Sequence, residues 1–215
     1  MSTSVLKWRK LKTRSDTPPL DLDLETRQWG LWVEPDATNI KTLWNLCLGE
    51  TEPVEGQIAW FENPRPLAKN IWAYCAFRQT LGAVNGTGTL IARLTLLENL
   101  AIYYQHVLGY ASLAAEEAAW PWLEMLNLTE WSGAFGGSLP PNKLSLALLA
   151  LNLAKEPKIF FLDRPRAVFN QDFKLVWSIL WALKETKGLS ALIFDRHEKS
   201  WSEEILAGDL VVLST

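Results

Sequence analysis

The sequence predicts an α/β domain with a mostly parallel central sheet and an antiparallel β part near the N-terminus. Apolar runs with strand character alternate with segments whose apolar residues recur at helical spacing, as in sheets whose strands are joined by helices. The segment 158–163 is apolar from Ile159 to Leu162 and ends in Asp163, which is typical of a central strand buried on both faces. With 215 residues, 48% of them hydrophobic, the chain can bury the core of one compact domain spanning 1–215.

The local patterns of apolar residues predict strands and helices in order along the chain. Residues 20–24 alternate between Leu and Asp and are followed, after a polar turn, by the apolar run 29–33, so two strands are expected here. The breaker residues 34–37 lead into 39–48, where apolar residues recur at helical spacing. Strand, loop and helix in this order form the skeleton of a phosphate-binding loop. The same criteria predict strands at 54–61, 81–84, 190–194 and 210–213, and helices at 94–108, 111–128 and 173–186.

Prolines mark two of the helices. The helix at 111–128 is expected to be interrupted by Pro121. A further helix should begin at Pro140 and Pro141, with Ser138 as its cap, and should run to about Ala154. Apolar residues occur nearly all round this helix, so it is predicted to be buried.

Composition narrows the class of protein. No apolar run reaches the roughly 18 residues needed to cross a bilayer and no signal-peptide pattern occurs, so a cytoplasmic protein without a nucleic-acid partner is expected. Cys47 and Cys75 lack metal-ligand spacing and are interpreted as buried free thiols. The basic N-terminal segment could approach an anionic membrane surface, but a solvated arm or edge strand is the favoured interpretation. This segment contains Lys7, Arg9, Lys10, Lys12 and Arg14.

Two consecutive segments carry a resemblance to a known family. Residues 42–49 (TLWNLCLG) and 52–58 (EPVEGQI) resemble the stretch that follows the Walker A loop in ATP-binding-cassette (ABC) ATPases. The order and spacing of elements over about 20–213 is similar to that of the ABC ATPase subunits of importers and exporters. Residues 88–100 look most like the ATPases of MCE-type lipid transporters. The resemblance implies a P-loop NTPase-like fold with a helical subdomain at about 86–145.

The resemblance also implies that the Walker A loop is degenerate. Aligned on the segments above, residues 34–42 stand where the family has G-P-x-G-x-G-K-S-T, and only Pro35 and Thr42 match. Such a loop binds phosphate through backbone N–H groups freed by glycines, a lysine and a hydroxyl that binds Mg²⁺. A one-residue slip would let Lys41 supply the cation, but the glycines would still be missing. The replacements are Glu34, Ala37 and Asn39 for glycine, Ile40 for lysine and Lys41 for the hydroxyl residue.

The other family motifs are altered in the same way. Gly86 stands at the Q-loop glutamine, and residues 139–143 (LPPNK) replace the signature L-S-G-G-Q. Asp163 matches the metal-binding aspartate of Walker B, whereas Arg164 replaces the glutamate that orients the attacking water and is expected to pair with Asp163 or another carboxylate. His197 lies close to the switch histidine, although an exposed loop histidine is an equal alternative.

Two functions follow from the resemblance. The leading hypothesis is a pseudo-ATPase with no bound cofactor, which docks on a membrane permease subunit or a partner ABC ATPase, or forms a homodimer, at the inner face of a membrane. Its docking surface is expected within 86–131, although the same aromatics can instead pack the helical subdomain. The alternative is an active ATPase that binds ATP through Lys41, Thr42 and Asp163, with Mg²⁺ on Asp163 and Thr42. The candidate docking residues are Tyr103, Tyr104, Trp120 and Trp122.

Overall fold

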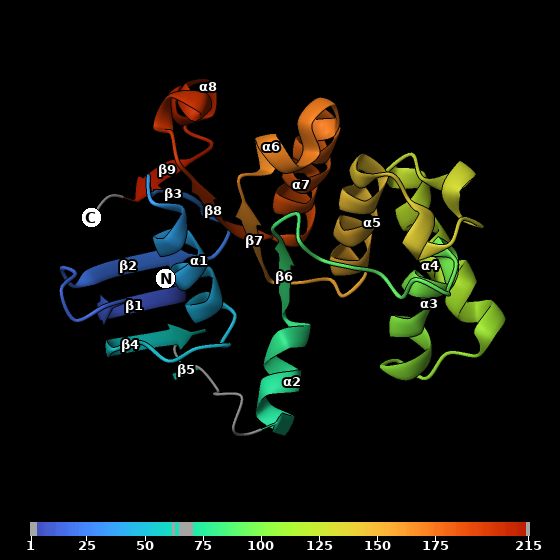
Figure 1. The fold of residues 1–215 in the computed structure, drawn as a ribbon, viewed down its shortest axis with the longest axis horizontal. Coiled ribbons are helices and arrows are strands. Elements are labelled where there is room, and N and C mark those ends of the chain that lie inside the picture. The colour runs from blue at the N-terminus through green and yellow to red at the C-terminus, as the bar shows by residue number, and fades with distance from the viewer. Residues whose placement is uncertain (1–3, 62, 65–70, 214–215) are drawn as a thin grey trace. The chain divides into compact units, whose positions relative to one another are not determined.

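The computed structural model describes residues 4–61, 63–64 and 71–213 and confirms the predicted α/β class (Figure 1). Two compact units can be distinguished. The first, called the sheet unit, contains Met1–Leu81, Lys158–Arg164 and Leu183–Thr215. The second, called the helical unit, contains Gly82–Pro157 and Pro165–Ala182. Each unit is described by itself.

An antiparallel sheet forms the first part of the sheet unit, in the strand order β2-β1-β4-β5. Its first strand was not predicted, and the interpretation of the basic N-terminal segment as a solvated arm or edge strand is wrong, because β1 lies between β2 and β4. The side chains of Leu6 and Trp8 are buried, while Lys7 and Arg9 both form ion pairs with Asp23. The bounds are β1 Ser4–Lys12, β2 Leu20–Glu25, β4 Glu55–Trp60 and β5 Asn63–Pro64.

The central sheet has five strands in the order β6-β7-β8-β3-β9. Within the sheet unit, β7, β8, β3 and β9 pair in parallel. Helix α1 packs on this sheet through Trp44, whose ring meets Phe161 and Phe194 edge-on at centroid distances of 6.4 and 6.2 Å. The strands are β3 Trp29–Val33, β6 Leu81–Val84, β7 Ile159–Asp163, β8 Ser190–Asp195 and β9 Val211–Leu213. The helices of this unit are α1 Ala37–Cys47, α2 Ile71–Gln79 and α8 Ser202–Leu206. Cys47 on α1 is buried as expected, whereas Cys75 on α2 is exposed, so the prediction of a buried thiol is wrong there.

The helical unit is built on α3, α4 and α5 (Figure 1). A capping box joins Thr95 and Glu98 at the start of α3. The buried side chain of Asn99 secures the preceding loop, since its amide donates to the carbonyl oxygens of Ile91, Leu94 and Thr95. The bounds are α3 Leu96–His106, α4 Ser112–Met125, α5 Pro141–Leu153 and α6 Pro165–Phe169. Helix α7, Phe173–Lys187, begins in the helical unit and ends in the sheet unit.

Two local predictions for this unit are wrong. Pro121 does not interrupt its helix, because α4 continues through it from Ser112 to Met125. Ser138 does not cap α5, since it lies in a short 3-10 turn and its hydroxyl donates to the carbonyl of Phe135 at 2.8 Å. The N-cap of α5 is Pro140, without a side-chain hydrogen bond. The expected burial of α5 is confirmed in part, for Ser145, Leu146, Ala147, Leu149, Ala150 and Leu153. None of the helices in the described part of the chain has both the length and the apolar character needed to span a bilayer.

Candidate functional site

The carboxyl ends of three neighbouring strands form the candidate site in the sheet unit. Val33 at the end of β3 pairs with Asp195 at the end of β8, and Asp163 at the end of β7 pairs with Phe194. The backbone continues these pairings beyond the strands, since Glu34 N–H donates to the Asp195 carbonyl at 2.9 Å. This edge is where open α/β sheets usually bind their ligands.

The connection from β3 to α1 is a short capped turn. Only residues 34–36 separate the two elements, and α1 begins at Ala37. Asp36 is the N-cap: its carboxylate accepts the Thr38 amide at 2.7 Å, and its own amide donates to the Glu34 carboxylate at 3.0 Å. The Ile40 amide donates to the Asp36 carbonyl at 3.1 Å, as in a regular helix. The segment expected to form a phosphate-binding loop is therefore largely the first turn of a helix.

The two candidate nucleotide ligands on α1 do not converge on this turn. The Lys41 side chain is exposed and has no hydrogen bond or ion pair to any residue that the structure describes. The Thr42 hydroxyl donates to the Thr38 carbonyl of its own helix at 2.9 Å. Ile40, at the position of the family's lysine, is buried in the core. Lys41 is the only Lys or Arg of α1, and no described contact holds its side chain at the capped turn.

Asp163 already has a positively charged partner. The guanidinium of Arg164 contacts its carboxylate through Nε at 3.0 Å and Nη2 at 3.3 Å, which confirms the predicted ion pair. The hydrogen bond to Asp163 raises the pKa of Arg164 above its ordinary value, and the charges of Asp163 and Asp195 add to this effect against the opposing effect of burial. The Arg164 amide donates to the Phe194 carbonyl at 2.8 Å. This hydrogen bond fixes the backbone of Arg164, from which the side chain reaches Asp163.

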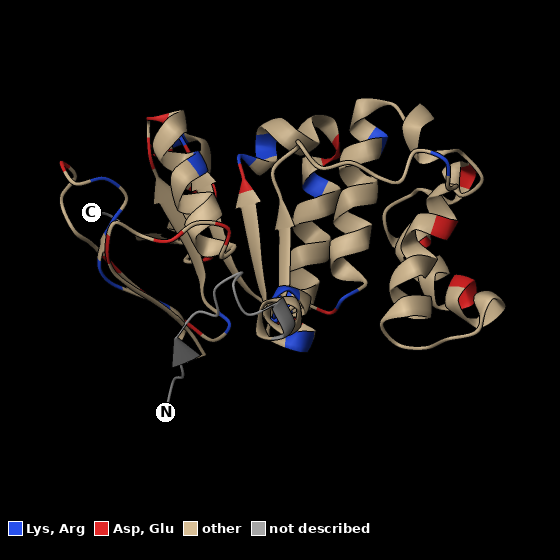
Figure 2. Cartoon of the chain, turned by 60° about the horizontal axis from the view of Figure 1, so that its bottom comes forward, with Lys and Arg blue, Asp and Glu red and all other residues tan. Residues whose placement is uncertain are grey.

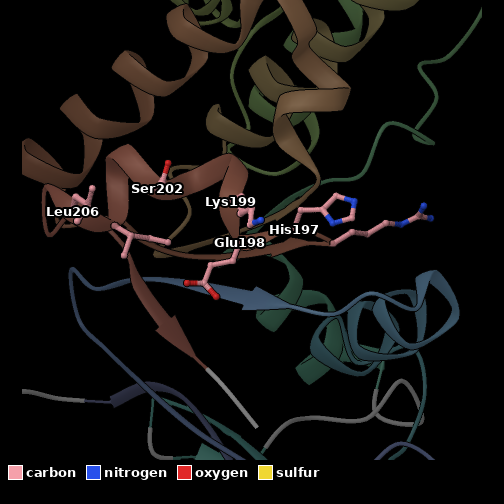
Figure 3. A pocket seen from close by; sticks show the side chains of 7 residues that line it. His197, Glu198, Lys199, Ser202 and Leu206 are labelled. Carbon is pink, nitrogen blue, oxygen red and sulfur yellow. The ribbon is translucent and has the colours of Figure 1, made fainter.

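His197 lies on the turn that follows β8, beside an open hollow of about 810 Å³ (Figure 3). Asp195 holds this turn, because its buried carboxylate accepts the Arg196 amide at 2.6 Å and the Trp201 indole N–H at 2.9 Å. His197 and Leu206 lie at opposite ends of the hollow in Figure 3, and Glu198 points to a different side from Ser202. No pair of acid and base converges there in the described part of the chain. The lining consists of Arg196, His197, Glu198, Lys199, Ser202, Ile205 and Leu206.

The positions expected for the Q-loop and signature lie in the helical unit. Gly86 has φ +73°, and a Cβ atom at this position would come within 3.2 Å of the Val168 side chain. The position therefore suits glycine better than the glutamine of the family. Pro140 and Pro141 open α5 and have no amide hydrogen to donate to a phosphate.

The four candidate docking aromatics divide into buried and accessible residues. Tyr104 and Trp122 are buried and joined by a hydrogen bond from the indole N–H to the phenol oxygen at 2.8 Å, so they pack the helical unit and leave the docking set. Burial raises the pKa of the Tyr104 phenol. Tyr103 is half-buried, and its ring packs edge-on against that of Tyr104. Trp120 is 37% exposed and donates its indole N–H to the Glu124 carboxylate at 2.9 Å.

Sequence analysis missed Asp36 and Asp195, which organise this edge of the sheet. Asp36 could have been found from its position directly before a helical pattern, where Asp is among the preferred N-cap residues. Asp195 carries no such local signal, since its role depends on Trp201 folding back across the turn.

Solved structures with the same arrangement of elements are ATP-binding cassettes. A dimeric bacterial ABC transporter cassette superposes with a TM-score of 0.78 at 17% identity, covering 97% of this chain and 94% of that one. The cassette cbiO1 from Clostridium perfringens, part of the ABC transporter complex cbiONQ, gives a TM-score of 0.75 at 14% identity, covering 91% of this chain and 79% of that one. The chain therefore has the fold of an ABC ATPase, with its parallel sheet, antiparallel β part and helical subdomain.

One curated protein shares detectable sequence similarity. It is the glutamine transport ATP-binding protein GlnQ of Geobacillus stearothermophilus, which is 24% identical over 129 residues. The match covers 60% of this chain and 52% of GlnQ, so the chain spans about half the length of the curated relative it matches. No protein-family model matches the sequence.

Proposed function

We propose that this chain is an ABC transporter ATP-binding subunit that has kept the cassette fold and lost ATP hydrolysis. It acts as a pseudo-ATPase that docks on a membrane permease subunit or a partner ATPase. The fold shared with ABC cassettes supports the first part of the proposal, and the capped first turn of α1 supports the second. The resemblance of residues 88–100 to MCE-type ATPases favours lipid as the transported class.

The carboxylate of Asp36 caps the N-terminus of α1, the kind of helix end at which phosphates bind. A helix N-terminus binds phosphate because its first amides are free and its dipole favours a negative charge. Here Asp36 accepts the Thr38 amide, and Glu34 lies two residues before it. A phosphate charge about 4 Å from a carboxylate is repelled by about 1 kcal/mol in water and about 4 kcal/mol at an effective dielectric of 20. With Ile40 in place of lysine, α1 offers no buried cation to offset this repulsion.

Binding of Mg²⁺ at Asp163 is disfavoured as well. Mg²⁺ on Asp163 would have to displace the guanidinium of Arg164 from a two-point contact. Arg164 also occupies the place of the residue that orients the attacking water, and a guanidinium that stays protonated cannot accept a proton. Hydrolysis would therefore fail even if a nucleotide were bound.

The alternative is an active ATPase that binds MgATP through Lys41, Thr42 and Asp163. It requires the Thr42 hydroxyl to leave the Thr38 carbonyl before it can bind a metal. It also requires the exposed Lys41 side chain to turn towards the strand ends.

Calorimetry with MgATP on the full chain tests the proposal. We expect no heat of binding up to millimolar nucleotide, and a micromolar dissociation constant would overturn the proposal. Phosphate release is measured in parallel on wild type and Asp163→Asn, which keeps the shape of the side chain but loses its charge. Release that disappears in Asp163→Asn would show a true ATPase, whereas equal release from both proteins identifies a contaminant.

A further inference from the structure

Both oxygens of the Asp163 carboxylate are bonded to the same guanidinium. Arg164 donates through Nε to one oxygen at 3.0 Å and through Nη2 to the other at 3.3 Å. The Asp163 side chain is 13% exposed, whereas that of Arg164 is 39% exposed. In Figure 2 the red tip of strand β7 is followed directly by blue, where the acidic residue gives way to the basic one. A divalent cation could reach either oxygen only after the guanidinium had moved, so the site as it stands does not fit Mg²⁺.

The neighbouring carboxylate, at the end of β8, has neutral donors instead of a cation. Asp195 accepts the Arg196 amide through one oxygen and the Trp201 indole N–H through the other. The negative charges of Asp163 and Asp195 nevertheless both act on the Arg164 guanidinium and favour its charged form. Arg164 therefore supplies positive charge to the carboxyl ends of two adjacent strands.

The backbone of Arg164 adopts a conformation that arginine rarely takes. Its φ is 45°, in the left-handed region that favours glycine. The residue is held there from two sides, because its amide donates to the Phe194 carbonyl at 2.8 Å and its side chain is bonded to Asp163. Backbone strain of this kind persists only where the surroundings fix it, and it is frequent at functional positions. The fold thus fixes the guanidinium at the carboxylate.

A guanidinium can take the electrostatic place of a divalent ion at a carboxylate. Mg²⁺ and Mn²⁺ prefer oxygen ligands and neutralise the carboxylates that bind them. The planar guanidinium neutralises the same group with two parallel hydrogen bonds. A metal ion dissociates into solution, whereas a guanidinium on the adjacent residue stays at high local concentration. The carboxylate is therefore neutralised at any concentration of free metal.

We propose that Arg164 is a tethered cation that replaces the divalent metal ion at Asp163 and keeps the carboxyl ends of β7 and β8 in one state, whether or not metal or nucleotide is present. This inference rests on the proposed loss of ATP hydrolysis and goes further, because it assigns a positive role to the residue that replaces the family's glutamate. Arg164 acts here as a positioning residue, which fixes the carboxylate of Asp163. Removal of its charge should return a divalent-cation site to this carboxylate.

Binding of Mn²⁺ without nucleotide, measured by electron paramagnetic resonance on the full chain, tests the proposal. Arg164→Gln removes the charge but keeps a Cβ atom, so the backbone strain is unchanged. This variant should bind an additional Mn²⁺ relative to wild type, with a Kd of about 0.1–1 mM, as expected for a site with few charged ligands. The double variant Asp163→Asn, Arg164→Gln should lose the additional Mn²⁺. Arg164→Lys keeps a tethered charge and should bind no more Mn²⁺ than wild type.

Thermal unfolding distinguishes a tethered cation from an ion pair with a purely structural role. Arg164→Gln should lower the Tm by about 2–10 °C, because the Asp163 carboxylate loses both hydrogen bonds. Mn²⁺ at about ten times its Kd should restore about 3–6 °C of this loss. The wild-type Tm should be the same in EDTA and in millimolar Mn²⁺. A purely structural ion pair would give the loss of Tm without the recovery.

Arg14 and Asp16 provide a matched control on the surface. Arg14 also contacts its carboxylate through two nitrogens, each at 3.2 Å, but both side chains are exposed. Arg14→Gln removes this two-point contact and should bind no additional Mn²⁺, and its Tm should not respond to Mn²⁺.

Three outcomes would overturn the proposal. The first is equal Mn²⁺ binding by wild type and Arg164→Gln, and the second is wild-type binding that disappears in Asp163→Asn. The third is a fall in Tm of Arg164→Gln that Mn²⁺ does not reverse. If Arg164→Gln unfolds in EDTA but folds with Mn²⁺, the proposal is supported; if it folds in neither condition, the proposal is wrong.

A separate titration of wild type with MgATP keeps the two proposals apart. Nucleotide binding would overturn the pseudo-ATPase proposal, whereas the measurements with Mn²⁺ alone decide the role of Arg164 whatever the nucleotide result. The two failures are therefore distinguishable.

Discussion

Replacing Asp36 by Ala removes the carboxylate that accepts the Thr38 amide at 2.7 Å and leaves that amide to solvent. Loss of an N-cap acceptor costs about 0.5–2 kcal/mol, typically about 1. Because Asp36 is exposed, we expect a value near 1 kcal/mol, including the lost attraction between the carboxylate and the helix dipole. For a chain of this size that corresponds to a fall in Tm of about 2–4 °C.

Asp36→Asn separates the hydrogen bond from the charge. It keeps a side-chain oxygen for the Thr38 amide and loses only the dipole contribution, so its Tm should lie between those of wild type and Asp36→Ala. Thermal unfolding by circular dichroism gives the Tm, and hydrogen exchange with mass spectrometry reports α1 directly. Exchange in its first turn should be about fivefold faster in Asp36→Ala, as 1 kcal/mol implies.

Glu185→Gln on the exposed face of α7 is the control and should change neither measurement. The reasoning is refuted if Asp36→Ala keeps the wild-type Tm and exchange rates, or if Asp36→Asn loses as much stability as Asp36→Ala. Either result would mean that the Asp36 carboxylate does not hold the first turn of α1 closed.

Three other expectations are tested separately. Millimolar MgATP should leave the Tm unchanged, whereas a ligand at 100 times its Kd would add about 2.7 kcal/mol to the free energy of unfolding. A rise in Tm of several degrees by scanning fluorimetry would contradict this expectation. Arg164→Glu alone should not restore phosphate release, because the capped turn of α1 remains; measurable turnover by the purified variant would contradict it. Tyr104→Phe leaves the Trp122 indole N–H without its acceptor and should lower the free energy of unfolding by about 1–3 kcal/mol in urea titrations; an unchanged value would show that this hydrogen bond does not stabilise the fold.

Stability at high pH gives a further test of the buried phenol. Burial raises the pKa of Tyr104 above its ordinary value of 10.0. The folded state therefore favours the protonated phenol, and its contribution is fully present below about pH 10 and is lost as the pH rises through the folded-state pKa. Urea unfolding above pH 10 should show a smaller loss of stability for Tyr104→Phe than for wild type. An identical pH dependence of the two proteins would contradict this.

The strands and helices that were predicted from sequence are those with an uninterrupted pattern. The apolar run ending in Asp163 gave β7 because a strand buried on both faces needs no alternation. Strand β1 was missed because Leu6 and Trp8 alternate but the next buried residue is Leu11, three positions on. The strand pairing shifts register between Trp8 and Leu11, and Lys10 there has φ 49°. Because the strand is irregular, the alternation of apolar residues with period two is not recognisable among its basic residues.

Prediction of the site succeeded where neighbours in sequence interact. Asp163 and Arg164 are adjacent at a strand end, so their pairing could be expected from sequence. The roles of Tyr104 and Trp122 could not, because the contact between them depends on how α3 packs against α4. An aromatic residue is equally compatible with a core position and with an interface position, so the residue type alone does not separate the two.

Pro121 gives the two halves of α4 different mechanical properties. It has no N–H, so the carbonyl of Glu117 lacks its usual donor and the helix can bend at this point. The half before it is held by the small side chains of Ala115 and Ala119, whereas the half after it is held by Trp122 and its neighbour Leu123. Local opening should therefore cost less free energy in the half of α4 before Pro121 than in the half that Trp122 and Leu123 hold in the core.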